Sequence, residues 1–447
     1  MEMPDRGRGR MMIRSSVLPR RSGWYNNNSA AAPDHRTRKS RGGRVPDESS
    51  TPDGRVVHIV GGGIAGLTMA ILLHRSGVPC TVHEAGSHRS GIGGGLNVAT
   101  NGMKVLAAAG VADRVTAAGT TVDTYALLGQ DGTVLVEFPY SEPEVHGQPC
   151  VSLARATLLG ILTDRARRLG VDIRYGAKVV EVSAPGDTLR FADGTTASGR
   201  LVVGADGAHS SVRRFVAHQG STAEYAGLVG IAGATRVAAL PGLDRAEIEA
   251  ITLTIGAGGL LGWGGGDAGT IMWWTYLPHD TDPGWPVTRE KLLDRFAGYP
   301  KPVGAVIANT DSASRVRLYG VAPLPSWHRD RAVLIGDAAH AVPPTSGQGA
   351  SLALEDAAHL AGLLAAEDDH RAAFARFEQH RRPRVERAVT EASLGPADGD
   401  SAVAALIVGG LPGGPDLIRR ANDVLTESFV GLYSDEGRRW KFGYDVP

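Results

Sequence analysis

The chain has 447 residues, of which 42% are hydrophobic, and its formal net charge is zero. This length is enough for two or three packed units, and a zero net charge gives no argument for binding to nucleic acid or a membrane. No apolar run reaches the roughly 18–20 residues needed to cross a bilayer. Two cysteines, Cys80 and Cys150, are too few for a disulfide framework, so we expect both to be reduced in a cytoplasmic protein.

The first 54 residues differ in composition from the rest of the chain. They contain 11 Lys and Arg against 6 Asp and Glu, a net charge of +5 (11 − 6), and are rich in Ser, Gly and Pro. This composition predicts a disordered basic arm, and the arm lacks the apolar segment of a secretory signal. A basic tether for an acidic partner is the functional alternative.

Ordered structure is expected to begin at residue 55. A β-branched run at 55–60 leads into Gly61-Gly-Gly-Ile-Ala-Gly66 and then into an apolar helix. In this G-x-G-x-x-G pattern Gly61 permits a tight turn, Gly63 lets a pyrophosphate approach the backbone, and Gly66 lets the helix pack against the strand. The free N–H groups at the helix start, together with the helix dipole, favour bound phosphates.

The next predicted strand strengthens this interpretation. It covers Cys80–Glu84 and ends in an acidic residue about 20 positions after the glycines, where an acceptor for a ribose hydroxyl is expected. Together these elements predict a site for an adenine dinucleotide. They leave both NAD and FAD open.

A helix expected between Ser152 and Gly170 carries a cation in its first turn. Arg155 at this position opposes the helix dipole. A partner anion, such as a cofactor phosphate, is therefore favoured over a plain surface arginine. Before this helix, residues 123–138 are typical of a β-hairpin that turns at Asp131-Gly132.

The middle of the chain is predicted to be rich in strands. Residues 200–203 form one strand, followed by an acidic turn at Gly204-Ala-Asp206-Gly207 and a helix start. Further strands, separated by glycines, are expected at 228–237, 251–261 and 269–277.

The last of these strands alternates large side chains on its two faces. Core packing is the simplest explanation for any single aromatic residue here. We nevertheless assign one face to a flat, apolar substrate pocket formed by Met272, Trp274 and Tyr276.

The later part of the chain contains a second acidic turn. Strands at 316–319 and 331–335 are expected to return to a parallel sheet, and the second of them ends in Gly336-Asp-Ala-Ala-His340. A Pro/Gly loop then opens a long helix at Ala350. Other helices are predicted at 288–298, 371–392 and over most of 396–447.

Three motifs follow one another along the chain: the glycines at 61–66, the acidic turn at 204–207, and Gly336-Asp-Ala-Ala-His340 with its loop. Over about residues 54–390 this arrangement resembles the single-component (group A) FAD-dependent aromatic hydroxylases. These are flavoprotein monooxygenases of the p-hydroxybenzoate hydroxylase type. Within that family the chain is most similar to the shorter members, such as salicylate and urate hydroxylases.

The resemblance implies an α/β fold with a discontinuous Rossmann-like FAD-binding domain, a mainly β substrate domain and a helical C-terminus. The FAD-binding domain would comprise 55–124, 150–222 and 315–390, and the substrate domain 125–149 and 223–314. Residues 391–447 would form the helical tail. A monomer or a homodimer is expected.

The resemblance also implies the cofactor site. Glu84 would bind the adenosine ribose and Arg155 the phosphates, while Asp206 would support the phosphate region and the nicotinamide donor. Asp337 would bind the ribityl chain. The implied cofactor-binding residues are Gly61, Gly63, Ile64, Ala65, Gly66, Glu84, Arg155, Val179, Asp206, Gly336, Asp337, Pro344, Gly347, Gln348, Gly349 and Ala350.

The backbone at 347–350 would face the flavin N1–C2 carbonyl, where helix N–H groups stabilise the anionic reduced ring. In the implied mechanism NADPH or NADH reduces FAD, and O2 adds to give a C4a-hydroperoxide. Its terminal oxygen is then transferred to an electron-rich aromatic carbon. The mechanism needs no protein nucleophile and no metal, because the cofactor carries the chemistry.

Other functions compete with this hypothesis. An FAD-dependent oxidase, dehydrogenase or epoxidase on the same fold is the main alternative. A halogenase, a plain NAD-dependent dehydrogenase and a non-enzymatic flavin-binding protein are less favoured by the motifs. His340 is expected to be structural, and His146 and His279 are expected to be loop histidines.

Overall fold

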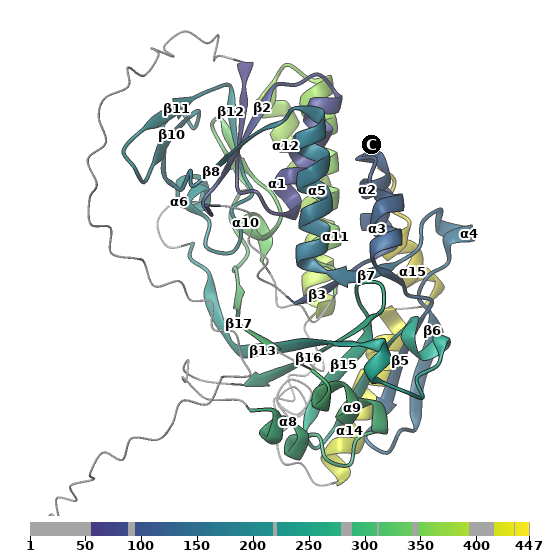
Figure 1. Ribbon diagram of the computed structural model, residues 1–447. Helices are drawn as coiled ribbons and strands as arrows, with labels where there is room; N and C mark the ends of the chain where they lie inside the picture. Colours follow the sequence, from purple (N-terminus) through teal and green to yellow (C-terminus); the bar gives the residue numbers. More distant parts are fainter. Residues whose placement is uncertain are drawn as a thin grey trace, which may run out of the picture.

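The computed structural model describes residues 55–87, 94–217, 221–278, 288–310, 313–341, 347–392, 415–432 and 434–446. Two large sheets dominate it, one above the other in Figure 1, and long helices pack on the upper sheet. The basic arm at 1–54, His279 and Pro344 lie outside the described residues.

The upper sheet has six strands and is mostly parallel. In spatial order they are β18 (His328–Arg329), β19 (Ala332–Leu334), β12 (Leu201–Gly204), β1 (Val57–Val60), β2 (Cys80–Glu84) and β8 (Asp172–Tyr175). Only β18, at the edge, pairs antiparallel among these described strands. The central strands β1 and β12 are buried along their whole length, as a parallel sheet covered on both faces requires.

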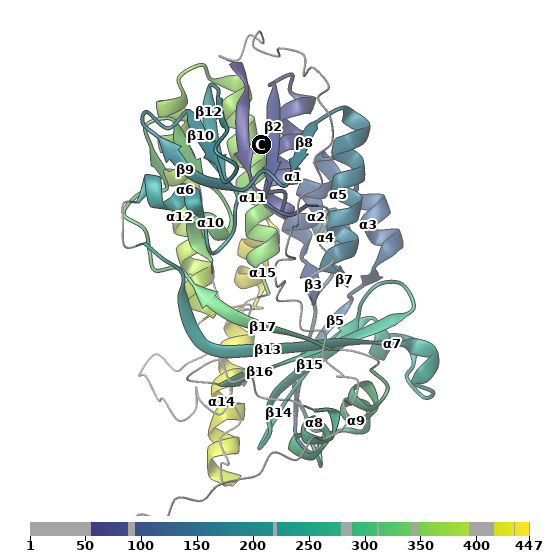
Figure 2. The ribbon, with the colours of Figure 1, turned by 60° about the vertical axis from the view of Figure 1, so that its left-hand side comes forward.

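Helices cover one face of this sheet and a small meander covers the other (Figures 1 and 2). The helical side contains α1 (Ile64–Arg75), α2 (Thr100–Ala108), α3 (Ala112–Ala118), α5 (Arg155–Leu169), α11 (Gly349–Ala366) and α12 (His370–Ala392). The other side contains β9 (Val179–Ser183), β10 (Thr188–Phe191), β11 (Thr196–Ser198), α6 (Ser211–Val216) and α10 (Asp337–His340).

The lower sheet has seven strands and is mainly antiparallel. In spatial order they are β17 (Ala313–Gly320), β13 (Glu224–Arg236), β16 (Thr270–Pro278), β15 (Gly259–Gly265), β14 (Ala250–Gly256), β5 (Thr124–Gly129) and β6 (Val134–Pro139). One face packs against α8 (Arg289–Arg295) and α9 (Lys301–Ala308), with Trp273 buried between them and the sheet.

Smaller elements connect the two sheets. A three-stranded sheet joins them in the order β3 (Gly95–Val98), β7 (Val151–Ala154) and β4 (Thr120–Thr121). The remaining helices are α4 (Pro143–His146), α7 (Arg245–Ile248), α14 (Pro415–Leu432) and α15 (Asp435–Phe442). No described helix combines the length and the apolar character that crossing a bilayer would require.

Three predictions from the sequence were wrong. The strand near 316–319 does not join the parallel sheet, because β17 pairs antiparallel with β13 at the edge of the lower sheet. The run 251–261 is not one strand. Gly259, with a φ of +94°, helps it to turn back as the hairpin β14–β15. Residues 152–154 belong to β7, so the helix begins only at Arg155.

Other expectations are confirmed. The hairpin predicted at 123–138 is β5–β6, and the long helices after 349 and 370 are present. The fold class is the expected α/β arrangement, with a Rossmann-like unit, a mainly β unit and helices at the C-terminus.

Candidate active site

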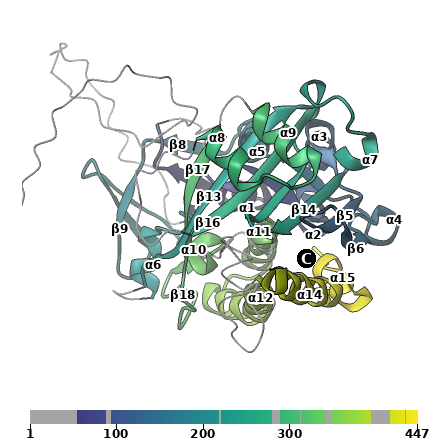
Figure 3. The same ribbon diagram turned by 90° about the horizontal axis from the view of Figure 1, so that it is seen from below.

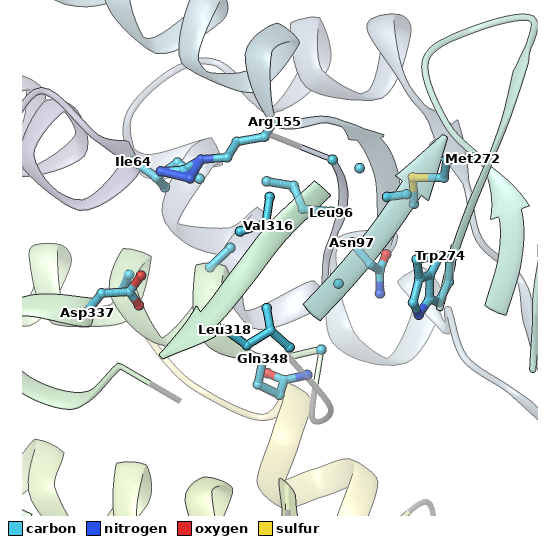
Figure 4. A pocket seen from close by; sticks show the side chains of 18 of the residues that line it. Ile64, Leu96, Asn97, Arg155, Met272, Trp274, Val316, Leu318, Asp337 and Gln348 are labelled. Atoms are coloured by element: carbon cyan, nitrogen blue, oxygen red, sulfur yellow. The ribbon is translucent and has the colours of Figure 1, made fainter. Parts of the chain in front are cut away.

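A cavity of about 440 Å³ lies between the two large sheets. One end is lined by the first residues of α1 and α11, and the other end by side chains of the lower sheet. Figure 4 shows Arg155, Ile64 and Asp337 on one side of this space and Met272 and Trp274 on the opposite side. The cavity therefore joins the predicted cofactor residues to the predicted substrate pocket.

The glycine loop after β1 is shaped by close backbone contacts. A β-carbon on Gly61, whose φ is +107°, would lie 2.3 Å from the carbonyl oxygen of Ala205. A β-carbon on Gly66 would lie 2.0 Å from the carbonyl oxygen of Gly61. Around Gly63, in contrast, no described atom beyond its chain neighbours lies within 4 Å of the β-carbon position. This leaves the start of α1 open to a phosphate group.

Glu84 lies beside this loop at the end of β2. Its carboxylate accepts hydrogen bonds from the backbone N–H of Gly62 at 2.8 Å and of Gly86 at 2.7 Å. These bonds fix the glycine loop against the strand. Each carboxylate oxygen retains a second lone pair that can accept a ribose hydroxyl.

Arg155 and Asp337 bring opposite charges to the cavity. Arg155 is the first residue of α5, and its guanidinium extends toward Ile64 at the start of α1 (Figure 4). Asp337 is the first residue of α10 and is exposed to the cavity. The cation thus lies near the phosphate-binding loop, while the carboxylate lies on a separate wall.

Asp206 belongs to the loop that follows β12. Its carboxylate turns into its own loop, where it accepts from the backbone N–H of Ser211 at 2.7 Å and from the Ser211 hydroxyl at 2.8 Å. Its neighbours Ala205 and Gly207 line the cavity. The side chain therefore shapes the loop that borders the cavity.

Arg213, which sequence reasoning missed, holds the two acidic turns together. It is 1% exposed, and its guanidinium donates to the carbonyl oxygen of Ala208 in one turn and to that of Ala338, at 2.9 Å, in the other. The sequence could have indicated this role, since Arg213 follows the acidic turn at 204–207 and lies at the start of a helix.

The start of α11 forms another wall of the cavity. Gly347, Gln348, Gly349 and Ala350 all line it. No side chain caps this end of the helix and no acidic residue occupies its first turn. Its N–H groups can therefore stabilise negative charge in the cavity.

A buried ionic network supports this wall from behind. Asp356 Oδ2 accepts from the backbone N–H of Gly336 at 2.9 Å and lies 2.6 Å from His340 Nε2, while Oδ1 accepts from Arg381 at 2.8 Å. Burial alone would raise the pKa of Asp356, but His340 and Arg381 outweigh it and hold the pKa well below its usual range. His340 has the structural position that was expected.

The substrate end of the cavity is lined by β16 and its neighbours. Met272, Trp274 and Tyr276 line it, and burial raises the pKa of Tyr276. A β-carbon on Gly262 would lie 2.4 Å from two indole carbons of Trp274. The glycine therefore allows the indole to lie close against β15.

Several polar residues at this end were not predicted. Asn97 donates to the hydroxyl oxygen of Tyr140 at 2.8 Å, and both residues line the cavity together with Tyr125 and Lys441. Tyr125 and Tyr140 have ring centroids 5.2 Å apart. The sequence offered no local signal for this cluster, because its members come from distant segments.

The remaining predicted site residues have varied positions. Ile64 and Ala65 line the cavity, whereas Gly61, Gly66 and Gly336 shape the backbone beside it. Val179, the first residue of β9 in the meander, is 6% exposed and belongs to the hydrophobic core.

These features fit FAD. The open helix start at Gly63 can receive a pyrophosphate, and the second open helix start at 347–350 can receive a polar ring edge. The two are joined by one cavity that also presents Asp337. A cofactor with a dinucleotide at one end and a redox ring at the other matches this arrangement.

Comparison with known proteins agrees with this geometry. Residues 54–392 match the FAD binding domain family. The chain is 33% identical to Aurachin C monooxygenase/isomerase of Stigmatella aurantiaca over 342 residues, which is 75% of this chain and 86% of that protein. It is 31% identical to the FAD-dependent urate hydroxylase of Klebsiella pneumoniae over 75% of this chain and 88% of that protein.

Solved structures show the same similarity. The structure of Klebsiella pneumoniae HpxO complexed with FAD and uric acid matches with a TM-score of 0.68 and 27% identity, over 83% of this chain and 97% of that chain. The chain thus belongs to the FAD binding domain family and is one of its FAD-dependent monooxygenases.

Proposed function

We propose that this protein hydroxylates an aromatic or heteroaromatic small molecule, with O2 as the oxygen source and NADPH or NADH as the electron donor. The observation that carries the proposal is the shared cavity. The start of α11 and the apolar side chains of β16 line the same space, so a flavin ring and a flat substrate can meet there.

Residues at one end of the cavity would hold FAD. The N–H groups at the start of α1 would bind the pyrophosphate, with Arg155 as an additional cation and Glu84 as the ribose acceptor. Asp337 would bind the ribityl chain, and the N–H groups at 347–350 would face the polar edge of the ring. The chemistry that bound FAD supplies is acceptance of hydride and activation of O2.

Residues at the other end would orient the substrate and exclude water. Leu253, Leu260 and Trp274 form apolar walls, while Asn97 and Tyr140 present polar groups. An apolar enclosure protects reactive oxygen chemistry from water. The mixed lining suits a planar ring that carries at least one polar substituent.

The names of relatives support this substrate class. Proteins similar to this chain include 3-amino-4-hydroxybenzoate 2-monooxygenase PtmB3 of Streptomyces platensis, 32% identical, and 6-hydroxynicotinate 3-monooxygenase of Pseudomonas fluorescens, 29% identical. Both named substrates are hydroxylated rings. We infer that the substrate of this chain is also a ring activated by an electron-donating group.

Isotope incorporation tests the proposal. The purified FAD-loaded protein should oxidise NADPH or NADH faster when a hydroxylated aromatic compound is present. With ¹⁸O2 the product should carry one heavy oxygen atom, and with H2¹⁸O it should carry none. A product without oxygen from O2 would instead identify an oxidase or a dehydrogenase.

A further inference from the structure

The turn between β15 and β16 joins the lower sheet to the FAD-binding unit. The backbone N–H of Ala268 in this turn donates to the carbonyl oxygen of Ala118 at 3.0 Å, and Ala118 is the last residue of α3. The carbonyl oxygen of Gly266 accepts from the Thr120 hydroxyl at 3.0 Å. Strand β16, which follows the turn, carries Met272 to the cavity. The turn therefore connects the strand at the substrate end of the cavity to the other unit.

Asp267 in this turn binds the start of α5. Its Oδ1 accepts from the backbone N–H of Ala154 at 2.8 Å, and its Oδ2 accepts from the hydroxyl of Thr157 at 2.8 Å. Ala154 immediately precedes α5 and has no side-chain acceptor, and the first turn of the helix contains no acidic residue. The carboxylate that a helix start favours is thus supplied here by the lower sheet.

The two contacts of Asp267 lie on either side of Arg155. One carboxylate fixes position 154 through the backbone and position 157 through the side chain. The first turn of α5 therefore cannot rotate without losing a hydrogen bond to a charged group. The backbone N–H of Arg155 itself donates to the carbonyl oxygen of Gly94 at 3.1 Å. The backbone from which the Arg155 side chain extends is thus held from several directions.

The place of the Arg155 guanidinium in the cavity depends on this backbone. The guanidinium extends toward Ile64 at the start of α1 (Figure 4). Because it lies at the end of a long side chain, a small rotation of the first turn of α5 would move it away from the phosphate-binding loop. Displacement of a binding group by about 1 Å is enough to weaken its contribution strongly. Asp267 therefore acts on the cavity without lining it.

We propose that Asp267 is a positioning residue for the cofactor. From the substrate sheet it holds the start of α5, and it thereby directs the Arg155 guanidinium toward the loop that receives the FAD pyrophosphate. This inference rests on the proposed contact between Arg155 and FAD. It makes the affinity for the cofactor depend on a residue of the sheet that carries the substrate pocket.

A double-mutant cycle on FAD affinity tests this role. FAD-loaded protein is diluted, and the dissociation constant is measured from the fluorescence of released FAD for the wild type, Asp267→Ala, Arg155→Met and the protein with both changes. We expect Arg155→Met to weaken binding about tenfold and Asp267→Ala about fivefold. In the double variant Asp267→Ala should add less than about a twofold loss, because the side chain that it directs is gone.

The salt dependence of FAD binding is a second readout, and a general loss of stability would not reproduce it. Salt screens the attraction between a guanidinium and a phosphate. FAD binding by the wild type should therefore weaken as the salt concentration rises, and this dependence should be smaller in Arg155→Met. Asp267→Ala should show the same reduced dependence as Arg155→Met.

Conservative variants separate hydrogen-bond geometry from charge. Asp267→Asn should bind FAD within about twofold of the wild type, since its amide can accept from the Ala154 N–H and donate to the Thr157 hydroxyl oxygen. Thr157→Val removes only one of the two bonds and should weaken FAD binding about threefold. This milder variant carries the test if Asp267→Ala does not fold.

Asp244→Ala is the matched control. Asp244 also caps a helix with its carboxylate, accepting from the backbone N–H of Glu247 at 2.9 Å, but this helix is α7 at the end of the lower sheet (Figure 3). Loss of this cap should leave the FAD affinity unchanged.

The proposal is overturned if Asp267→Ala leaves FAD affinity unchanged, or if it causes the same loss with and without Arg155. It is also overturned if Arg155→Met has no effect, if Asp267→Asn binds as weakly as Asp267→Ala, or if the control loses as much affinity. Should Asp267→Ala not fold, wild-type affinity in Thr157→Val overturns it. These measurements need no turnover, so failure of the proposed hydroxylation would appear separately, as a product without ¹⁸O.

Discussion

Asp337 presents its carboxylate to the cavity from the first turn of α10. If it accepts hydrogen bonds from the ribityl chain, Asp337→Ala should weaken FAD binding about tenfold or more, because a hydrogen bond to a charged group contributes about 1.5–3 kcal/mol. The dissociation constant can be measured from the fluorescence of released FAD. Asp193→Ala, in an exposed turn, is the control. Equal FAD affinity in both variants would show that Asp337 does not contribute to FAD binding.

His83 makes the stability of the protein depend on pH. Burial, followed by the nearby His58, lowers the pKa of His83 from 6.5 to about 3, and the two rings are linked by nitrogens 3.0 Å apart. Below pH 6.5, His83 therefore binds a proton in the unfolded chain but stays neutral in the folded state. The contribution of His83 to the free energy of unfolding is fully present above pH 6.5. It decreases by about 1.4 kcal/mol per pH unit as the pH falls toward 3.

Thermal unfolding should accordingly shift to lower temperature between about pH 7 and about pH 5. The same shift should be smaller in His83→Gln, whose side chain does not titrate. Identical pH dependence in the two proteins would exclude His83 as its source.

At the scale of single elements, β15 sets the position of an aromatic side chain on β16. Gly262→Ala would place a methyl group where Trp274 now lies, and overpacking of this kind costs about 1–3 kcal/mol. We expect the indole to move into the cavity, so that ring compounds bind more weakly while FAD content is unchanged. Flavin absorbance titration measures both.

The control for Gly262→Ala is Gly304→Ala on α9, where no described atom beyond the chain neighbours and the helix's own backbone lies within 4 Å of the new carbon. A Gly262→Ala protein that binds ring compounds like the wild type would show that the indole position does not matter.

The contact between α11 and α12 depends on a buried arginine. Arg381 pairs with Glu355 and Asp356, and all three are 0% exposed. Arg381→Met would leave two carboxylates without this cation, which typically costs about 3–5 kcal/mol. Denaturant unfolding should show this loss. Arg376→Met on the same helix removes only an exposed pair, and its cost should be about 0–1 kcal/mol.

At the scale of the whole molecule, the cofactor site lies between two large sheets. FAD bound there should stabilise both units together. At a concentration 100 times its dissociation constant, a ligand adds about 2.7 kcal/mol to the free energy of unfolding. FAD-free protein should therefore melt at a lower temperature than reconstituted protein, in a single transition for both units. A melting temperature independent of FAD would contradict the assigned site.

Local motifs predicted several residues that line one end of the cavity, because each motif is a short strand–turn–helix segment. Gly63 and Ile64 belong to one such segment, and Asp337 belongs to another. The substrate end depends on tertiary contacts that no window of sequence contains. Lys441 and Tyr140 are brought to one cavity by segments 301 positions apart in the chain (441 − 140).

The errors in strand assignment have a related cause. Residues 316–319 were predicted to join the parallel sheet. The alternation of Arg315 and Arg317 with apolar residues instead suits an exposed edge of an antiparallel sheet. Sheet membership depends on partners far away in the chain, and these are not visible in local pattern.

The buried network behind α11 connects the turn at Gly336 to the end of the C-terminal helix α15. Asp356 holds the turn at Gly336, Arg381 joins it to Glu355, and Glu355 holds Arg384, which binds the end of α15. Thermodynamic linkage is reciprocal: whatever FAD binding adds to the docking of the tail, docking of the tail adds to FAD affinity. Docking of the C-terminal helix and binding of FAD can thus each strengthen the other.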